Sequence, residues 1–317
     1  MELSICIPTY NRPELLQRAL ASVAQTPPAQ ASHVEIIVSD NSTDDRSAAV
    51  TARFAQGWPG PVIYHQNKPS ISRVDNQNQS IALARGRWVQ ILHDDDYLLS
   101  GGIDRLLVGL DRARSTDRVL LFGVNVVDKL GRRLRSQSFF RDRFLAPHLA
   151  LQRLLSHSSF VRMPAIVVRR EAYTEIGPFE SGWGGIDDIA MWIRLFGAYG
   201  VRLFPLTTSA YMVHPAADSY AVSTPEAITT LTHIFEYFVP RGVLSERALR
   251  RCRTHFFHQF VLAGTFRRLR ARDRAGAQKV MELFQMPEVR SLGLSFRWAP
   301  VRLAFATACI GVRATRS

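Results

Sequence analysis

Three consecutive aspartates, Asp94, Asp95 and Asp96, could bind a metal ion. Carboxylates this close raise one another's pKa unless solvent or a cation neutralises them. Oxygen ligands suit Mg²⁺ or Mn²⁺, and the coordination of Mg²⁺ is often completed by substrate phosphates. Because the run follows the apolar stretch 88–92, we expect a metal and diphosphate site at the end of a buried strand. A solvated turn that caps a helix is the alternative.

A second pair of carboxylates, Asp187 and Asp188, stands at the start of an amphipathic segment and follows a glycine-rich stretch. Asp187 alone could cap that helix. Since a cap needs only one carboxylate, we interpret Asp188 as a general base, with Trp183 and Gly184 in the wall of an acceptor site. His214, just past a short predicted strand, is a candidate metal or phosphate contact, with a structural role as the alternative.

These side chains require a scaffold whose strands end at one edge. The apolar runs 3–8, 34–38 and 88–92 alternate with segments of helical periodicity, which predicts a parallel α/β sheet. Each run is followed by polar residues: Thr9-Tyr10-Asn11, Asp40-Asn41-Ser42 and the aspartates. Ligands bind at the carboxyl ends of such strands, so we expect the three clusters to share one cleft.

The polar residues after the first two strands also have structural alternatives. The segment 11–14 has the pattern of a helix start, with Asn11 as the N-cap. Asp40 could accept a hydrogen bond from a ribose or base, or close an Asx-turn. Tyr10 could stack on a base or pack on its own helix.

The sequence pattern changes near Ser223. From there on, long helical segments carry aromatic and basic residues, so we predict a catalytic domain over 1–223 and an α-helical region over 224–317. The apolar and basic stretch 296–313 would suit the surface of an acidic membrane. The alternatives are a helix packed on the catalytic domain with solvated arginines, or a contact in a homo-oligomer.

The composition narrows the class of protein. Three widely spaced cysteines form no disulfide or zinc pattern, which predicts a reducing, cytoplasmic setting. A net charge of +13 favours an anionic partner, but no nucleic-acid-binding motif accompanies it, and we expect no nucleic acid partner. We find neither a signal peptide nor a spanning apolar window, so we expect a soluble protein or one peripheral to the inner face of the plasma membrane.

Four motifs, spread over roughly 1–215, resemble glycosyltransferase family 2. In chain order they are Ile7-Pro8-Thr9-Tyr10-Asn11-Arg12, Val38-Ser39-Asp40-Asn41-Ser42, Ile91-Leu92-His93-Asp94-Asp95-Asp96 and Ile186-Asp187-Asp188. Together they are specific for the superfamily and uninformative about the sugar. The resemblance implies the GT-A fold, a Rossmann-like α/β fold whose mostly parallel central sheet is flanked by helices.

The resemblance also implies roles for single residues. The nucleotide-sugar would be bound by Pro8, Thr9, Tyr10, Asn11, Arg12, Asp40 and Asp94. Asp95 would bind a divalent metal, Mn²⁺ or Mg²⁺, with Asp94, Asp96 and His214 as further candidates. Two departures stand out: His93 replaces the usual first aspartate of the DXD motif, and Gln77 replaces an arginine, for which Arg73 is the candidate substitute.

The implied reaction is an inverting transfer of a sugar from a UDP-, dTDP- or GDP-sugar to a glycan or lipid-linked acceptor, in surface polysaccharide biosynthesis. Asp188, paired with Asp187, would deprotonate the acceptor hydroxyl. One alternative is a catalytically inactive scaffold that binds nucleotide-sugars. Another is a metal-dependent sugar nucleotidyltransferase, although the sequence lacks a glycine-rich triphosphate-binding loop.

Overall fold

The computed structural model describes residues 1–157, 159–213 and 223–310. The chain forms two compact units, which interleave along the sequence. Unit 1 consists of Met1–Pro147, Val161–Ser181 and Ala198–His214, and unit 2 of His148–Phe160, Gly182–Gly197 and Pro215–Ser317. The domain boundary near Ser223 remains a prediction.

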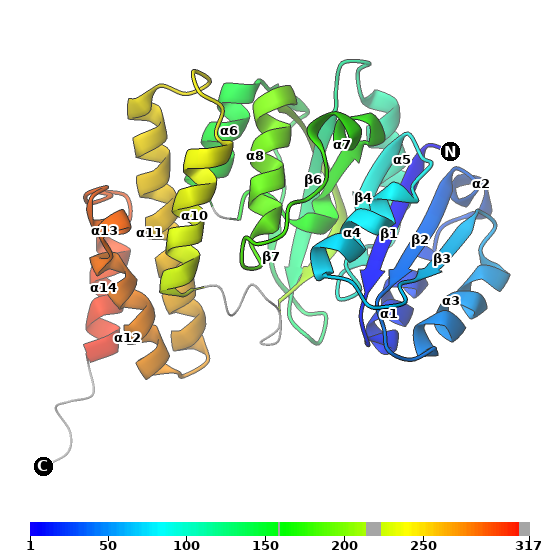
Figure 1. Cartoon of the computed structure of the whole chain (residues 1–317), viewed down its shortest axis with the longest axis horizontal. Helices are drawn as coiled ribbons and strands as arrows, with labels where there is room; N and C mark the ends of the chain where they lie inside the picture. Colours follow the sequence, from blue (N-terminus) through cyan, green and yellow to red (C-terminus); the bar gives the residue numbers. More distant parts are fainter. Residues whose placement is uncertain (158, 214–222, 311–317) are drawn as a thin grey trace, which may run out of the picture. The chain divides into compact units, whose positions relative to one another are not determined.

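Unit 1 is built on a ten-stranded sheet, in which eight strands follow the order β3-β2-β1-β4-β9-β6-β10-β5. The strands are β1 (Leu3–Thr9), β2 (Val34–Asp40), β3 (Val62–Gln66), β4 (Trp88–Ile91), β5 (Tyr97–Leu98), β6 (Val119–Val127), β7 (Arg133–Gln137), β8 (Arg143–Leu145), β9 (Ile166–Arg169) and β10 (Val201–Met212). Strands β3, β2, β1 and β4 are parallel neighbours, as are β6 and β10, whereas β9 and β5 are antiparallel to their neighbours. The predicted mostly parallel α/β sheet is confirmed (Figure 1).

Helices cover the two faces of this sheet because alternate strand residues point to opposite sides. The helices of unit 1 are α1 (Pro13–Val23), α2 (Pro28–Ala31), α3 (Arg46–Gly57), α4 (Arg73–Ala82), α5 (Gly102–Arg112) and α7 (Arg170–Ile176), with a 3₁₀ turn η1 (Met163–Ala165). Leu3, Ile5 and Ile7 of β1 are fully buried in one core with apolar residues of α1 and α5. Cys6 faces the other side, where its Sγ donates to the Ser80 carbonyl oxygen of α4 at 3.2 Å. The sheet is therefore held between two helical layers.

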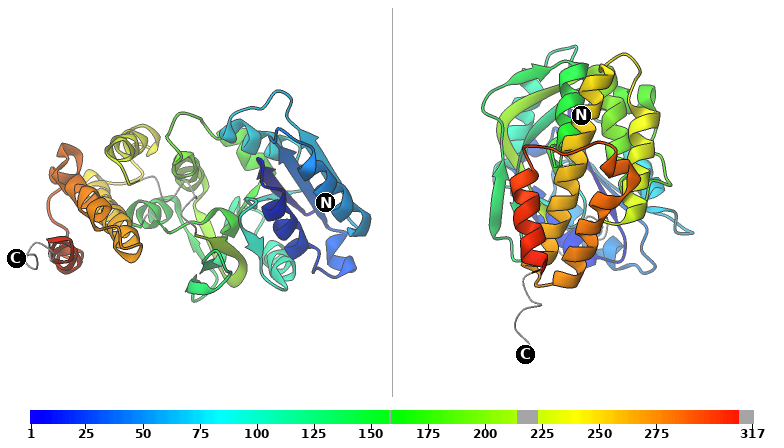
Figure 2. Two further views of the ribbon diagram at one scale, coloured as in Figure 1. Left: turned by 90° about the horizontal axis from the view of Figure 1, so that it is seen from below. Right: turned by 90° about the vertical axis from the view of Figure 1, so that its left-hand side faces the viewer.

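Unit 2 is helical. It contains most of α6 (Pro147–Ser156) and of α8 (Asp187–Tyr199), together with α10 (Pro225–Phe238), α11 (Glu246–Arg270), α12 (Arg274–Glu282), η2 (Leu283–Gln285), α13 (Pro287–Arg290) and α14 (Ala299–Ile310). Its core includes Phe235 of α10, whose ring lies 5.0 Å from Phe256 and 5.7 Å from Phe257 of α11. Helix α14 packs against α11 and α12, as Figure 2 shows. Within the described parts of the chain, no helix has the length and apolar character needed to cross a membrane.

Candidate active site

The carboxyl ends of β1, β2 and β4 meet at one edge of the sheet. Thr9 is in register with Asp40 across the β1 and β2 pair, and β4 runs parallel on the other side of β1. The Thr9 hydroxyl donates to Asp94 Oδ2 at 2.8 Å, and the Asn41 N–H donates to the Thr9 carbonyl oxygen at 3.0 Å. The three polar clusters predicted from the sequence are thus in direct hydrogen-bond contact.

Asn11 joins the first two clusters instead of capping α1. The N-cap position of α1 is Arg12, whose side chain makes no capping bond, and Pro13 follows in the first turn. Asn11 has a φ of 52°, its N–H donates to Ser42 Oγ at 2.7 Å, and its Oδ1 accepts from the Thr43 N–H at 2.9 Å. The expected N-cap role of Asn11 is wrong because the loop after β2 uses its side chain.

Asp40 is fully buried and fixes the loop that follows β2. Its Oδ1 accepts from the Ser42 N–H at 2.8 Å, which is the Asx-turn expected as one alternative. Its Oδ2 accepts from the Tyr64 hydroxyl of β3 at 2.7 Å. Burial and the hydrogen bond to Asp40 both raise the pKa of Tyr64, so this hydroxyl remains a donor.

Asp94 is the first aspartate of the run and the one most closely tied to β1. Besides Thr9, it contacts Arg12, whose Nη1 lies 3.5 Å from Asp94 Oδ1. Burial and the charge of Asp95 raise the pKa of Asp94 to about 6. The hydrogen bond from Thr9 and the charge of Arg12 lower this pKa, but their effect is smaller. A carboxylate held this way favours nearby cations and hydroxyl donors.

His93, Asp95 and Asp96 form a cluster that can hold a metal ion, because their ligand atoms lie within 4.8 Å of one another. Asp96 is 1% exposed; its Oδ1 accepts from the Met212 N–H of β10 at 2.9 Å, and its Oδ2 has no hydrogen-bond partner among the described residues. Burial and then the charge of Asp95 raise the pKa of Asp96. Two carboxylates and an imidazole suit a divalent cation such as Mn²⁺. The sequence indicates His93 only as a departure from the DXD motif and not as a metal ligand, and Asp94, a predicted ligand, stands outside this cluster.

Several residues without a recognisable motif support these groups. Arg18 of α1 donates through Nη2 to the Asp95 carbonyl oxygen, and its guanidinium lies 5.2 Å from the ring centre of Tyr97. Asn76 of α4 donates to the Thr9 carbonyl oxygen at 3.2 Å and accepts from Asn67 at 2.8 Å. For Asn67 and Asn76, the sequence signal was the preference of asparagine for loops and helix starts.

The remaining predicted donor residues of unit 1 lie around this edge. Pro8 is half-buried opposite Ser39 in the β1 and β2 register. The Tyr10 side chain is 52% exposed, so a ring face is accessible to a ligand. Arg73 is exposed and is the first residue of α4. None of these three positions by itself tests the expected contact with a nucleotide.

The predicted acceptor-side residues belong to unit 2. Asp187 is the first residue of α8, and its Oδ1 accepts a hydrogen bond from the Trp183 N–H at 3.3 Å. Asp188 is half-buried, and its Oδ1 accepts a hydrogen bond from the Ile189 N–H. Trp183 is half-buried because its ring packs edge-on against the Phe238 ring, with 5.3 Å between the ring centres. Gly184 has a φ of 60° and open space around it. His214 lies outside the described residues.

The family model for glycosyl transferase family 2 matches residues 4–177, which is more than half of the chain. The chain belongs to this family. The match begins in β1 and includes β2, β4 and the aspartate run, the elements that form the polar edge described above. The predicted resemblance is confirmed, and the protein is a member of a family of sugar transferases.

Curated relatives of this family member come from several bacteria. An uncharacterised protein of Mycobacterium tuberculosis, MT1568, is 29% identical over 64% of this chain and 64% of its own length. The abequosyltransferase RfbV of Salmonella typhimurium is 32% identical over 35% of this chain and 33% of its own. A Campylobacter jejuni GalNAc(5)-diNAcBac-PP-undecaprenol beta-1,3-glucosyltransferase is 30% identical over 33% of each. The aligned part of this chain thus spans between a third and two thirds of these relatives.

Solved structures resemble almost the whole chain. Residues 1–349 of S. aureus TarS, in complex with UDP-GlcNAc, align over 98% of this chain and 92% of that one, with a TM-score of 0.64 and 16% identity. The mannosyltransferase PcManGT of Pyrobaculum calidifontis, in complex with GDP-Man and Mn²⁺, aligns over 98% and 86%, with a TM-score of 0.56 and 15% identity. At this identity the likeness concerns the fold, and it confirms the GT-A architecture.

Proposed function

We propose that this family 2 glycosyltransferase is an inverting enzyme that transfers a sugar from a nucleoside diphosphate donor to a hydroxyl of a lipid-linked or free surface glycan. The observation that carries the proposal is the contact between Thr9 and Asp94, next to the cluster of His93, Asp95 and Asp96. It brings the ends of β1 and β4 together around groups that suit a metal and a diphosphate.

The donor would be bound at this polar edge. Tyr10 offers an exposed ring to a base, and Asn11, Arg12 and Arg73 offer exposed polar groups to the ribose and phosphates. The complexes of TarS with UDP-GlcNAc and of PcManGT with GDP-Man support a nucleotide-sugar as the ligand class. Asp40 accepts two hydrogen bonds already, so any contact with the donor would use its remaining lone pairs.

The metal would be Mn²⁺ or Mg²⁺. Asp95 and Asp96 would hold it with His93, and Asp94 would face the donor while hydrogen-bonded to Thr9. When bound, such an ion stabilises negative charge on the departing diphosphate as a Lewis acid. The unpartnered Oδ2 of buried Asp96 supports this assignment, because a buried oxygen with no donor is costly unless a cation occupies the site.

Asp188 would act as the general base for the acceptor. Asp187 accepts a hydrogen bond from the Trp183 backbone, so it supports the glycine-rich loop and leaves the proton transfer to Asp188. Attack by the deprotonated hydroxyl on the face opposite the leaving diphosphate inverts the anomeric configuration. Trp183 and Gly184 would line the acceptor. The undecaprenol-linked substrate in the name of the Campylobacter relative supports a lipid-linked acceptor and a place at the inner face of the plasma membrane.

Turnover of a donor panel tests this proposal. UDP-, dTDP- and GDP-sugars are incubated with Mn²⁺ and the protein, and release of nucleoside diphosphate is measured with and without candidate acceptors. We expect one base to be preferred, and we expect Asp188→Asn to lower kcat by about 10²- to 10⁴-fold while the Kd of the nucleotide is unchanged.

Glu246→Gln is the matched control, because Glu246 is an exposed carboxylate in the first turn of another helix of unit 2, α11. It should leave kcat unchanged. Nucleotide binding without any turnover in the wild type would favour a catalytically inactive scaffold. Release of pyrophosphate from a nucleoside triphosphate would instead indicate a sugar nucleotidyltransferase.

A further inference from the structure

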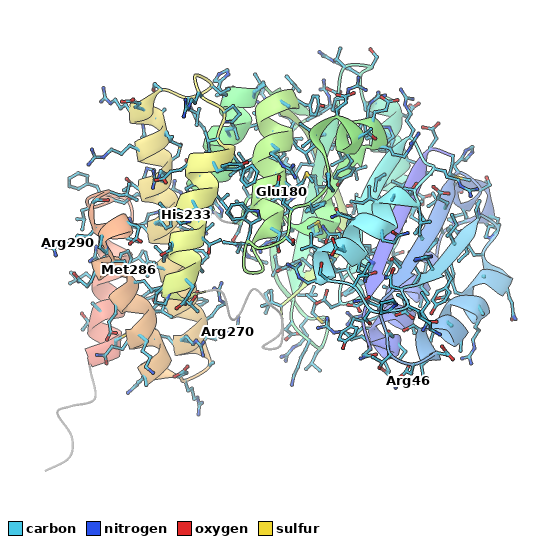
Figure 3. The ribbon with its side chains drawn as sticks, in the orientation of Figure 1. Arg46, Glu180, His233, Arg270, Met286 and Arg290 are labelled. Atoms are coloured by element: carbon cyan, nitrogen blue, oxygen red, sulfur yellow. The ribbon has the colours of Figure 1, made fainter. Side chains whose placement is uncertain are left out.

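Unit 2 contains a cavity of about 250 Å³ that is lined in part by the loop joining α13 to α14. Its lining residues come from α11, η2, α13, this loop and α14: His258, Phe284, Gln285, Val289, Arg290, Gly293, Leu294 and Arg302. His258, Phe284 and Val289 are at most 3% exposed, so these three side chains form the buried floor of the cavity. Figure 3 labels Arg290 at the outer edge of this unit.

Two arginines of the cavity have no acidic partner among the residues that the structure describes. In the described part of the chain no carboxylate forms an ion pair with Arg290 or Arg302. The Arg302 guanidinium lies 4.0 Å from the centre of the Phe284 ring, which fixes it in place. The acidic residue next to Val289 is Glu288, and its Oε1 accepts from Thr229 at 3.3 Å. The cavity therefore offers fixed positive charge that no carboxylate of the described residues neutralises.

The imidazole in the cavity is neutral and serves as a structural group. His258 Nδ1 lies 2.8 Å from the Thr254 carbonyl oxygen, and its Nε2 lies 3.4 Å from the Ser295 N–H. The first contact requires a proton on Nδ1 and the second requires a lone pair on Nε2, which is the neutral tautomer. The guanidinium groups are thus the cations available to a ligand.

Three large exposed apolar side chains line the cavity or stand close in sequence to residues that line it. Leu294, which lines it, is 55% exposed, Phe296 is 89% exposed, and Leu303, next to Arg302 on α14, is 70% exposed. The charge of this region is strongly positive, with 14 arginines and lysines against six aspartates and glutamates over residues 223–310. Arginine beside exposed aromatic and aliphatic groups is the chemistry of an interface with anionic lipid.

We propose that this cavity binds the phosphate of an anionic membrane lipid through Arg290 and Arg302, while Leu294, Phe296 and Leu303 enter the headgroup layer. A phosphate oxygen accepts charge-assisted hydrogen bonds from guanidinium groups. A free phosphate ion would satisfy the arginines but would leave the apolar residues in water, so a lipid accounts for both features. The proposal is independent of the donor chemistry in unit 1.

Vesicle binding by the full-length protein tests this site. Co-sedimentation is measured with phosphatidylcholine vesicles that either contain or lack phosphatidylglycerol. We expect binding only when phosphatidylglycerol is present, a loss of roughly fivefold in affinity for Arg290→Gln, and a loss of at least that size for Phe296→Ser. Both residues are exposed, so the variants should fold, which circular dichroism checks.

The matched control is Arg274→Gln, which removes the same charge from an exposed position of α12 outside the cavity. It should cost clearly less affinity than Arg290→Gln. Equal losses for the two variants would overturn the proposal, because they would show diffuse attraction without a defined site. Equal binding to both kinds of vesicle would overturn it as well. Inorganic phosphate, added at a concentration equal to that of the lipid phosphate, should not displace the protein from the vesicles. Displacement under this condition would also overturn the proposal, because it would indicate a site for a free anion.

Discussion

The polar edge of unit 1 and the cavity of unit 2 both gather charged side chains, but they treat them differently. At the polar edge, Asp94 and Asp96 are buried and receive hydrogen bonds from Thr9 and from the Met212 backbone. In unit 2, Arg290 and Arg302 line a cavity without any carboxylate partner in the described part of the chain. The hydrogen bonds at the polar edge fix the positions of its carboxylates. The arginines of the cavity remain available to an anionic partner.

The distribution of charge along the chain follows the same division. Residues 1–213 contain 24 basic and 20 acidic residues, whereas residues 223–310 contain 14 and six. Residues 1–213 are thus close to balanced in charge. The surplus in the helical region is the kind of imbalance that favours association with an anionic surface.

The largest effect on stability that we predict comes from breaking the link between β1 and β4. Thr9→Val removes the hydroxyl that donates to buried Asp94, and it should lower the free energy of unfolding by about 1–3 kcal/mol. Thr232→Val in α10 is the matched control, because within the described residues the Thr232 hydroxyl bonds only to the Ile228 carbonyl oxygen of its own helix. Urea unfolding measures both, and equal losses would show that the strand ends are not coupled through Thr9.

We expect a smaller change in the free energy of unfolding when the pH is lowered, because His258 in unit 2 then takes up a proton. Burial lowers the pKa of His258 below its usual value of 6.5, so the unfolded chain binds a proton more readily than the folded chain. The contribution of His258 is therefore fully present above pH 6.5 and is lost as pH falls, by up to about 1.4 kcal/mol per pH unit. We expect His258→Gln to reduce this dependence between pH 7.5 and 5.5.

His233→Gln serves as its control, because His233 lies on the exposed side of α10 (Figure 3). The unfolding free energy of this variant should follow the wild type across the same range. A wild-type profile that His258→Gln leaves unchanged would mean that other groups cause the acid sensitivity.

We expect the smallest effect on stability from breaking the exposed ion pair between Arg46 and Asp44. In this pair, Arg46 Nε lies 2.9 Å from Asp44 Oδ2. Both side chains are largely exposed, so solvent screens the pair and Arg46→Gln should leave the unfolding midpoint unchanged within error. A clear loss of stability would show that pairing matters even without burial, and it would weaken the contrast between the two regions.

Much of the fold was predictable from the sequence, because apolar runs and turn residues mark β1, β2 and β4 directly. The helical segments predicted from residue 224 onward begin with α10 at Pro225. The antiparallel insertion of β9 between β4 and β6 was not predicted. Periodicity reveals that a strand exists, whereas its partner depends on contacts between residues far apart in sequence.

Part of the candidate site was predictable, because some of its residues belong to motifs that follow the apolar strands. Thr9, Asp40 and Asp94 occur in motifs at strand ends, and the structure brings them together. Arg18 and Tyr64 belong to no motif and were missed, although both contact the site residues. The roles of Asp187, Asp188 and Arg73 remain predictions, because their positions alone do not test a contact with substrate.

Calorimetric titration of UDP, dTDP and GDP tests the central claim most directly. It is carried out on the wild type and on Asp95→Ala, with Mn²⁺ and with a chelator in its place. We predict that one nucleotide binds only with Mn²⁺ and that Asp95→Ala abolishes this binding, because Asp95 belongs to the cluster with His93 and Asp96 that could hold the ion. Failure of all three to bind, or binding that neither the chelator nor the substitution affects, would contradict a metal-dependent donor site at the ends of β1 and β4.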